Sequence, residues 1–431
     1  MTSNGAKVTD KPIRVAFGSV PKDGGTFTFY RNSRPALRDL GVDLRCVTVG
    51  KDQAALVDDR FWDEGCVLLA ETEPDLKRQA MAFSDWCDAE DIDTVIGVNS
   101  HAILSSIPHL SPRIRTIARC ANGFDEGYQL TLVGRDRLMR IIALVPKLRD
   151  DLINTYGVDP GLIELIPNGV DPTNFTAVAQ SPRGQRDCLE LGFVGRLEHR
   201  QKGVLHIPAI LAGLRARGVP YRLRIIGRGK HEEQLRADLA DQIADGSVVF
   251  LGSQPADEVA RFLGDLDIFL FPSHFEGCPN ALLEALMAGA VPASWRLPGI
   301  TDYIIEDGVY GHLAEVGDHE GLSAGIAELH ADRERLQSMS KKAAEVAMTR
   351  FHNQVCAARY VEVFKSVLAE PLPTSAPAPW TQFRAAQVIA PSLPHRLRSY
   401  IQRRWFGGKH ENFVVAPPPR ADEVLQRVGS K

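Results

Sequence analysis

Two carboxylates stand eight positions apart in the segment FEGCPNALLE, at Glu276 and Glu284. The apolar run DIFLFPS before them predicts a buried strand, and Pro279 is typical of the first turn of a helix. Glu276 is then expected in the loop before that helix and Glu284 more than one turn inside it. The two acids either accept hydrogen bonds from sugar hydroxyls, as on a ribose or a hexose, or serve as a helix-dipole partner and a surface charge.

Two cations lie in the segment FVGRLEHRQKGV, residues 193–204, at Arg196 and Lys202. The apolar run predicts a strand that ends at Gly195 and Arg196, and a helix is expected to begin after Gly203. Both cations are therefore expected in a loop at the carboxyl edge of a sheet, where a guanidinium and an ammonium suit a pyrophosphate. The alternative is a pair of solvated surface cations, since arginine and lysine are mostly exposed.

A glycine turn and a histidine also follow predicted strands. In IIGRGKHEEQL, residues 225–235, Gly227 and Gly229 permit a turn where backbone can approach a ligand closely. The third glycine of a dinucleotide fingerprint is missing, and a tight strand-to-helix turn explains the same glycines. His101, in GVNSHA, follows another strand end and is either a ligand-facing side chain or a lone polar histidine in a loop.

The elements that must position these residues are short apolar runs that alternate with longer amphipathic segments. Strands are predicted over 13–18, 43–50 and 93–100, with a helix over 75–91. After a polar linker, 180–187, strands are predicted over 189–196, 221–229, 247–252 and 267–273, with a helix over 206–218. This alternation predicts an α/β protein with two parallel sheets, and ligands of such sheets bind outside the carboxyl ends of the strands.

Length and composition agree with a two-domain globular chain. The 431 residues are more than one hydrophobic core usually organises. A net charge of −4 gives no reason to expect nucleic-acid binding. The seven cysteines form no CxxC pair, which favours reduced thiols in a cytosolic protein and argues against a zinc site. No signal peptide is evident, and no apolar run approaches the roughly 18 residues that a spanning helix needs.

Several segments together resemble a known family. They are, in order, VPKLRDDLINTYGVDPGLIELIPNGVD (145–171), FVGRLEHRQKGV (193–204), FLGSQPADEV (250–259), FEGCPNALLEALMAGAVP (275–292) and GITDYIIEDGVYGHL (299–313). In this order they resemble the family-four retaining glycosyltransferases, whose defining pair has the E-x7-E spacing of Glu276 and Glu284. The resemblance implies the GT-B fold, in which two Rossmann-like domains face a central cleft.

The resemblance also implies a role for each candidate residue. Arg196 and Lys202 match the cations that hold the donor diphosphate, Glu276 the acid near the transferred sugar, and Glu284 the acid on the nucleotide ribose. His101 resembles a histidine placed against the sugar. The candidates for binding the nucleotide sugar through backbone or turn are Gly25, Gly227, Gly277, Cys278 and Pro279.

The implied organisation has four parts. Residues 1–180 form an acceptor-binding domain, 181–350 a nucleotide-sugar-binding domain, and 351–370 a helix that crosses back to the first domain. A Pro-rich linker and a basic tail fill 371–431. From position 380 onward the tail holds nine lysines or arginines and three acidic residues. Within the tail, apolar residues of segment 392–406 recur at helical spacing and predict an amphipathic helix. This helix either binds anionic lipid at the inner face of the membrane or packs on the protein body or on a partner.

The expected reaction is transfer of a hexose from a UDP- or GDP-hexose, with retention, to a glycan or lipid-linked acceptor of the cell envelope or capsule. Arg196 and Lys202 would meet the charge of the leaving diphosphate, so no metal or other cofactor is expected. Two alternatives stay open at this point. One is a sugar-nucleotide epimerase or phosphorylase on the same scaffold, and the other is a sugar-binding scaffold without catalysis.

Overall fold

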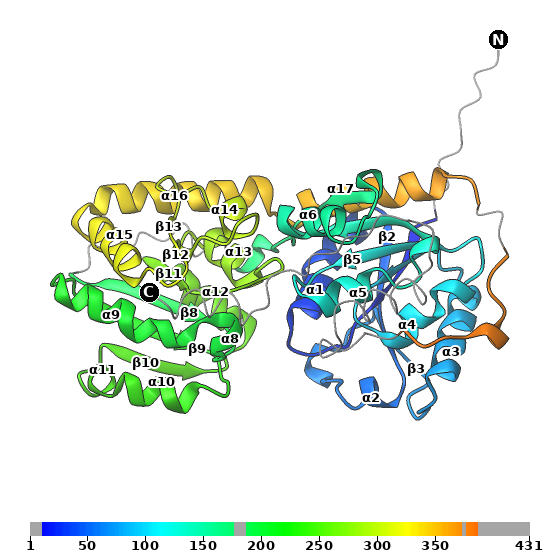
Figure 1. Cartoon of the computed structure of the whole chain (residues 1–431), viewed down its shortest axis with the longest axis horizontal. Coiled ribbons are helices and arrows are strands. Elements are labelled where there is room, and N and C mark those ends of the chain that lie inside the picture. The colour runs from blue at the N-terminus through cyan, green and yellow to red at the C-terminus, as the bar shows by residue number, and fades with distance from the viewer. Residues whose placement is uncertain (1–10, 176–186, 373–375, 387–431) are drawn as a thin grey trace, which may run out of the picture.

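The computed structural model describes residues 11–175, 187–372 and 376–386. Within them the chain forms two separate sheets, each with helices on both faces, arranged side by side (Figure 1). The first sheet has the strand order β3-β2-β1-β4-β5-β6-β7, and the second has the order β10-β9-β8-β11-β12-β13. Every pairing between these strands is parallel, so the predicted α/β class is confirmed.

We call residues 11–175 the first domain. Its strands are β1 (Ile13–Gly18), β2 (Val42–Val49), β3 (Cys66–Leu69), β4 (Thr94–Gly97), β5 (Arg115–Cys120), β6 (Leu138–Ala143) and β7 (Ile163–Leu165). Its helices are α1 (Gly25–Asp39), α2 (Lys51–Ala54), α3 (Leu76–Ala89), α4 (His101–Ser106), α5 (Asp125–Thr131) and α6 (Pro146–Asn154). The central strand β4 is buried along its whole length, as expected for a strand covered on both faces.

We call residues 187–350 the second domain. Its strands are β8 (Leu189–Val194), β9 (Tyr221–Ile226), β10 (Val248–Gly252), β11 (Ile268–Phe271), β12 (Val291–Trp295) and β13 (His312–Ala314). Its helices are α8 (His199–Lys202), α9 (Ile207–Ala216), α10 (Glu232–Asp238), α11 (Ala240–Ala244), α12 (Ala256–Gly264), α13 (Asn280–Met287), α14 (Thr301–Ile304), α15 (His319–Ala331) and α16 (Arg333–Arg350). The sequence predicted β8 to β11 but not β12 and β13. Among the predicted strands, two run three residues too far: 93–100 ends at Gly97 and 221–229 at Ile226.

A long helix, α17 (Asn353–Ala369), follows α16 and lies on the first domain (Figure 1). Its Tyr360 ring packs against Phe29 of α1 with a centroid separation of 5.4 Å. Just beyond its end, Glu370 pairs with Arg140 of β6 at 2.6 Å. Residues from both ends of the described chain therefore complete the first domain.

Residues 376–386 continue over the first domain beside α4, drawn in orange in Figure 1. Trp380 stacks on His109 with ring centroids 4.3 Å apart. Farther along, the Ala386 peptide N–H donates to the Ser105 hydroxyl at 2.8 Å. The predicted amphipathic segment 392–406 lies outside the described residues. Among the helices that the structure does describe, none is both long and apolar enough to cross a membrane.

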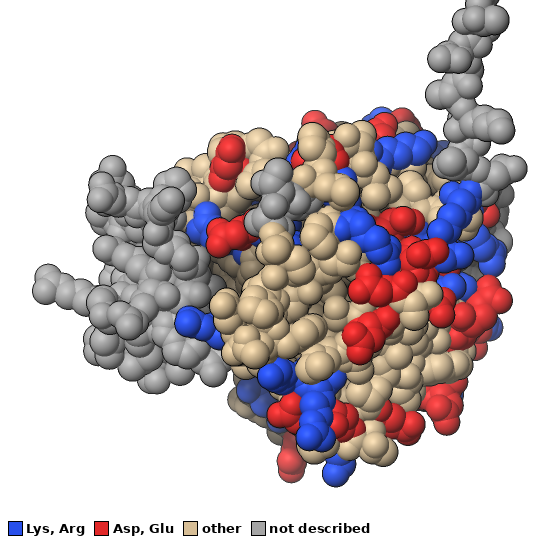
Figure 2. All heavy atoms as spheres, turned by 90° about the vertical axis from the view of Figure 1, so that its right-hand side faces the viewer, with Lys and Arg blue, Asp and Glu red and all other residues tan. Residues whose placement is uncertain are grey.

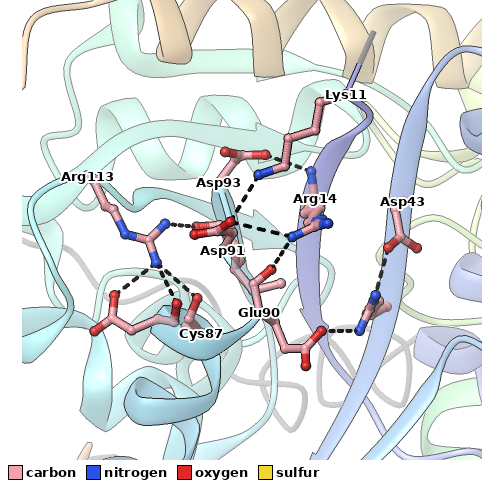
Figure 3. A network of polar contacts seen from close by, with 11 residues as sticks. Lys11, Arg14, Asp43, Cys87, Glu90, Asp91, Asp93 and Arg113 are labelled. Atoms are coloured by element: carbon pink, nitrogen blue, oxygen red, sulfur yellow. Dashed lines mark hydrogen bonds and ion pairs between the residues drawn. The ribbon is translucent and has the colours of Figure 1, made fainter. Parts of the chain in front are cut away.

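Charged side chains are frequent on the outer face of the first domain. On its outer face, lysines and arginines are mixed with acidic residues (Figure 2). At the amino ends of β1 and β4, Lys11 pairs with Asp91 at 3.1 Å and Asp93 accepts from the Arg14 peptide N–H at 2.9 Å (Figure 3). Exposed pairs of this kind contribute about 0–1 kcal/mol each to stability, so we interpret this network as ordinary surface pairing and not as a site.

Candidate functional site

The centre of the candidate site is an ion pair between Lys202 and Glu276. Lys202 Nζ lies 2.6 Å from Glu276 Oε1, although 74 positions separate the two residues in the chain. The Lys202 side chain is 17% exposed and that of Glu276 is 6% exposed. Lys202 Nζ also lies 5.8 Å from the centre of the Phe271 ring. The structure therefore brings two predicted site residues into direct, largely dehydrated contact.

Lys202 ends a one-turn helix, whereas the sequence predicted a loop at this position. Helix α8 begins where the Glu198 carboxylate accepts from the peptide N–H groups of Arg200 and Gln201, each at 2.9 Å. It ends at Gly203, which has the left-handed conformation (φ 61°) typical of a helix C-terminus. One turn is too short to show a hydrophobic period, and the cap at Glu198 was the signal that the prediction missed.

Arg196 reaches the ion pair through Gln201, a residue that the sequence reasoning did not consider. Arg196 is exposed and donates from its guanidinium to Gln201 Oε1 at 2.7 Å. The amide nitrogen of Gln201 in turn donates to Glu276 Oε2 at 3.4 Å. Three of the predicted site residues thus form one connected polar group, with Gln201 as the connecting side chain.

Glu284 stands apart from this group, on α13. Its side chain is half-buried, and no hydrogen bond joins it to Lys202 or Glu276 within the described part of the chain. Burial raises the pKa of Glu284, and the positive charge of Arg31 on α1 opposes this in part. Since α1 belongs to the first domain, Glu284 of the second domain lies within reach of a charge from across the junction.

The raised pKa of Glu284 predicts that the free energy of unfolding falls as pH rises. The folded state binds the Glu284 proton more tightly than the unfolded state, so stability is lost as pH rises from about 4.5, the unfolded value, through the raised value. Urea denaturation of the wild type and of Glu284→Gln at pH 4.5 and pH 7.5 tests this. The wild type should lose stability relative to the variant at the higher pH, and a constant difference would contradict it.

The two domains meet at residues 277–280, which are the turn before α13 and the first residue of that helix. Asn168, which follows β7, donates to the Cys278 carbonyl at 3.1 Å and to Asn280 Oδ1 at 2.6 Å. Asn280 Nδ2 lies 3.5 Å from the carbonyl oxygen of Gly25, the first residue of α1. Asn168 is a second residue that the sequence reasoning missed, although it lies in the quoted segment IPNGVD. Predicted residues from both domains therefore lie at one junction.

The predicted glycines Gly227 and Gly25 differ in whether the surrounding atoms leave room for a side chain. A Cβ on Gly227 would collide with the carbonyl group of Gly195, and the Gly227 φ of 141° is one that side chains rarely adopt. The tight-turn explanation therefore accounts for this glycine. For Gly25, in contrast, the nearest atom to an added Cβ is Asn280 Nδ2 at 3.6 Å. The N-terminus of α1 thus keeps open space beside the domain junction.

His101 begins α4 and is held by the C-terminal part of the chain. Its Nδ1 lies 3.1 Å from the Ala386 carbonyl oxygen. Within the described residues, no hydrogen bond joins His101 to Arg196, Lys202, Glu276 or Glu284. The structure therefore does not bring His101 together with the other candidates, and its role against a sugar stays a prediction.

Comparison with known proteins decides the family. A family model described as "Glycosyl transferases group 1" matches residues 189–332, and one described as "Glycosyltransferase Family 4" matches residues 23–174. Between them they cover more than half of the chain and both sides of the domain junction. The chain belongs to glycosyltransferase family 4. The resemblance to family four is thereby confirmed, while the meaning of the E-x7-E spacing stays a prediction.

Curated relatives of this family 4 chain match it over part of their length. WcaL of Salmonella typhimurium, named for a place in colanic acid biosynthesis, is 34% identical over 211 residues, which are 47% of this chain and 50% of WcaL. The amylovoran biosynthesis glycosyltransferase AmsK of Erwinia amylovora is 29% identical over 203 residues, which are 46% of this chain and 49% of AmsK. The chain thus matches about half the length of these relatives.

Solved structures show that the family 4 chain has the predicted GT-B fold. A glycosyltransferase from Rickettsia africae superposes with a TM-score of 0.66 at 14% identity, covering 84% of this chain and 100% of that one. HepE of Anabaena, solved in complex with UDP, has a TM-score of 0.67 at 17% identity, covering 82% of this chain and 99% of that one.

Cys278 of the family 4 chain contributes backbone to the junction, while its side chain points into protein. The thiol is buried in the same hydrophobic cluster as Cys356 and Tyr360 of α17. Desolvation raises the pKa of Cys278 to about 11, so the thiol stays protonated near neutral pH. A protonated, buried thiol is a poor nucleophile. Pro279, the next residue, is the N-cap of α13.

Proposed function

We propose that this chain is a retaining glycosyltransferase that moves a hexose from a nucleoside diphosphate hexose to a hydroxyl acceptor. The observation that carries the proposal is the buried Lys202–Glu276 pair, 2.6 Å apart, with Arg196 attached to it through Gln201. Cations at the carboxyl ends of parallel strands suit a diphosphate, and a buried carboxylate suits sugar hydroxyls. Family membership supports this reading of the pair.

The changes in charge during the reaction suggest a role for Lys202, Arg196 and Glu276. When the bond between the anomeric carbon and the diphosphate breaks, negative charge grows on the leaving oxygen. Lys202 and Arg196 supply positive charge that is already in place, which stabilises this state without reorganisation. In the ligand-free chain the Glu276 carboxylate neutralises Lys202. A bound diphosphate would therefore share Lys202 with Glu276, or replace Glu276 as the partner of Lys202. Glu276 is then free to accept from the hydroxyls of the sugar.

Retention would follow from attack on the same face as the leaving group, with the departing phosphate oxygen taking the acceptor proton. This route asks for no protein nucleophile. It agrees with the protonated state of Cys278, the thiol in the turn beside Glu276. We assign no general base, and we propose that Glu284 binds the nucleotide ribose. The chemistry assigned to these residues needs no metal ion.

The relatives narrow the substrates that we propose. HepE has been solved with UDP, with UDP and glucose, and with UDP-glucose, which favours a UDP-hexose over a GDP-hexose as donor. WcaL and AmsK carry the names of two polysaccharide pathways, colanic acid and amylovoran. We therefore propose a growing glycan, free or lipid-linked, as acceptor, and synthesis of a cell-surface polysaccharide as the process.

The test combines binding with product analysis on the full chain. A thermal-shift screen with UDP, GDP and their hexose conjugates should raise the melting temperature with one nucleotide series, since ligands of the folded state stabilise it. Proton NMR should then show slow donor hydrolysis in which the released sugar first has the anomeric configuration of the donor. Release of a sugar 1-phosphate or epimerisation of the donor would favour the alternative enzymes, and binding without turnover would favour the scaffold.

A further inference from the structure

Four histidines of the second domain gather in a cluster that includes the sequence neighbours of Lys202 and Glu276. His199 belongs to α8, His206 to the turn before α9, His274 to the loop after β11, and His319 begins α15. The ring centroids of His199, His206 and His274 are 5.1, 5.1 and 4.9 Å apart in pairs. His319 lies 4.9 Å from His206 on the other side. The imidazoles come from elements far apart in sequence, so the tertiary fold assembles this cluster.

We propose that His199, His206 and His274 bind a divalent transition-metal ion of the zinc type. One ring nitrogen of each histidine can be chosen so that the three atoms lie within 4.8 Å of one another. Imidazole nitrogens are ligands that zinc, copper and nickel prefer, and three protein ligands leave a fourth position for water or a further group. Cysteine spacing alone argued against zinc, but it takes no account of a site built from histidines.

The hydrogen bonds around the cluster orient two of the rings as ligands. His274 Nδ1 lies 3.1 Å from the Arg200 carbonyl oxygen, which can only accept, so Nδ1 carries the proton and Nε2 presents a lone pair. His206 Nδ1 lies 2.8 Å from His319 Nε2, and His206 Nε2 lies 2.7 Å from His274 Nε2. In the metal-free cluster a proton of His206 occupies the 2.7 Å gap. The metal ion would take its place.

Metal binding then requires only modest changes. The proton of His206 moves from Nε2 to Nδ1 and is donated from there to His319 Nε2. His319 changes tautomer to accept it, so the two rings together lose no proton. Outer partners of this kind typically fix the orientation of metal-binding histidines. His199 Nδ1 accepts a long 3.3 Å hydrogen bond from the Leu205 peptide N–H, and we expect metal binding to break it.

The surroundings keep the rings in the state that ligates metals. Desolvation, followed by the neighbouring imidazoles, lowers the pKa of His206 to about 3. Desolvation also lowers the pKa values of His199, His274 and His319. Neutral imidazoles present the lone pairs that a metal ion needs.

A bound ion would join the two segments that carry the candidate site. His199 lies three positions before Lys202, and His274 lies two positions before Glu276. The segments already touch, since the His274 peptide N–H donates to the Gln201 carbonyl at 2.8 Å. The metal would hold α8 against the loop after β11 and so fix the relative position of Lys202 and Glu276. This is a positioning role, and binding of the ion itself can be measured without any transfer assay.

The test uses the full chain, freed of its affinity tag and of bound metal, and titrated with Co²⁺ and Zn²⁺. We expect one ion per chain, visible absorption bands of bound Co²⁺ that Zn²⁺ abolishes, and a melting temperature that rises with Zn²⁺. His206→Gln and His274→Gln should lose the Co²⁺ bands. His319→Gln, which removes only an outer partner, should weaken Zn²⁺ binding about 10- to 100-fold.

His312→Gln is the matched control, because His312 lies in the same domain but bonds to the Gly321 carbonyl at 3.1 Å, outside the cluster. It should bind Co²⁺ as the wild type does. Absence of Co²⁺ bands and of Zn²⁺ binding in the folded wild type would overturn the proposal, whatever the variants do. Binding that survives in both His206→Gln and His274→Gln would overturn it equally.

Discussion

Replacing Lys202 with alanine is expected to slow glycosyl transfer by about 10²- to 10³-fold, the usual effect of removing one preorganised group that faces developing charge. The same change leaves the carboxylate of Glu276, 6% exposed, without its partner at 2.6 Å. Breaking a buried pair by removing one member costs about 3–5 kcal/mol of unfolding free energy. Turnover of the donor and urea denaturation of the same preparation measure the two effects.

The double variant Lys202→Ala/Glu276→Gln separates these effects. The second change removes the unpaired buried charge, so stability should recover in large part while transfer stays slow. Lys342→Ala is the control, because Lys342 forms an exposed pair with Glu345 at 3.0 Å in the same domain and should change neither quantity. Wild-type turnover in Lys202→Ala would refute the role proposed for this cation.

Replacing Gly277 with alanine is expected to hold the two domains apart. A Cβ on Gly277 would collide with the carbonyl group of Ala121, which follows β5 in the first domain. The backbone of Gly277 is not in the left-handed region, so the collision, and not strain in the turn, decides the outcome. Each domain has a hydrophobic cluster of its own and a third cluster spans the junction, so separation of the domains relieves the clash at the expense of part of that third cluster. Misplacement of reacting groups by about 1 Å can cost about 100-fold in rate, which is the loss of transfer that we expect.

Small-angle scattering and donor turnover test the Gly277→Ala prediction together. The radius of gyration should increase, while circular dichroism should show that both domains stay folded. Gly25→Ala serves as the control for domain spacing only, because its Cβ would meet nothing closer than Asn280 Nδ2 at 3.6 Å across the same junction. Unchanged scattering with unchanged turnover in Gly277→Ala would show that the junction does not set the geometry of the site.

The candidate site was only partly predictable from sequence. Arg196, Lys202 and Glu276 were candidates because their residue types and their places after strands are local features, and the resemblance of the ordered motifs then favoured a site over solvated surface charges. Gln201 and Asn168 were missed, since the importance of each comes from a partner in another element: Glu276 for Gln201, and the Cys278 carbonyl for Asn168. Polar side chains in loops carry no periodic signal, so nothing local distinguishes these two from ordinary surface residues.

The prediction for Lys202 shows the same limit in secondary structure. The sequence correctly placed this residue after a strand but not in α8, because a helix of four residues depends on its caps more than on periodicity. For Gly227 the sequence left two explanations open, and packing against the Gly195 carbonyl supports the tight turn. The domain boundaries and the roles of individual site residues remain predictions.

By itself, the sequence determined the α/β class, the two sheets and the positions at strand ends where charged residues stand. These follow from the short range of hydrophobic periodicity and turn chemistry. Only the tertiary structure decided that Lys202 neutralises Glu276, that Asn168 joins the domains, and that four histidines meet. Those contacts depend on the angles and registers at which distant elements pack, and a side chain's nearest partner is fixed only when its whole domain has closed around it.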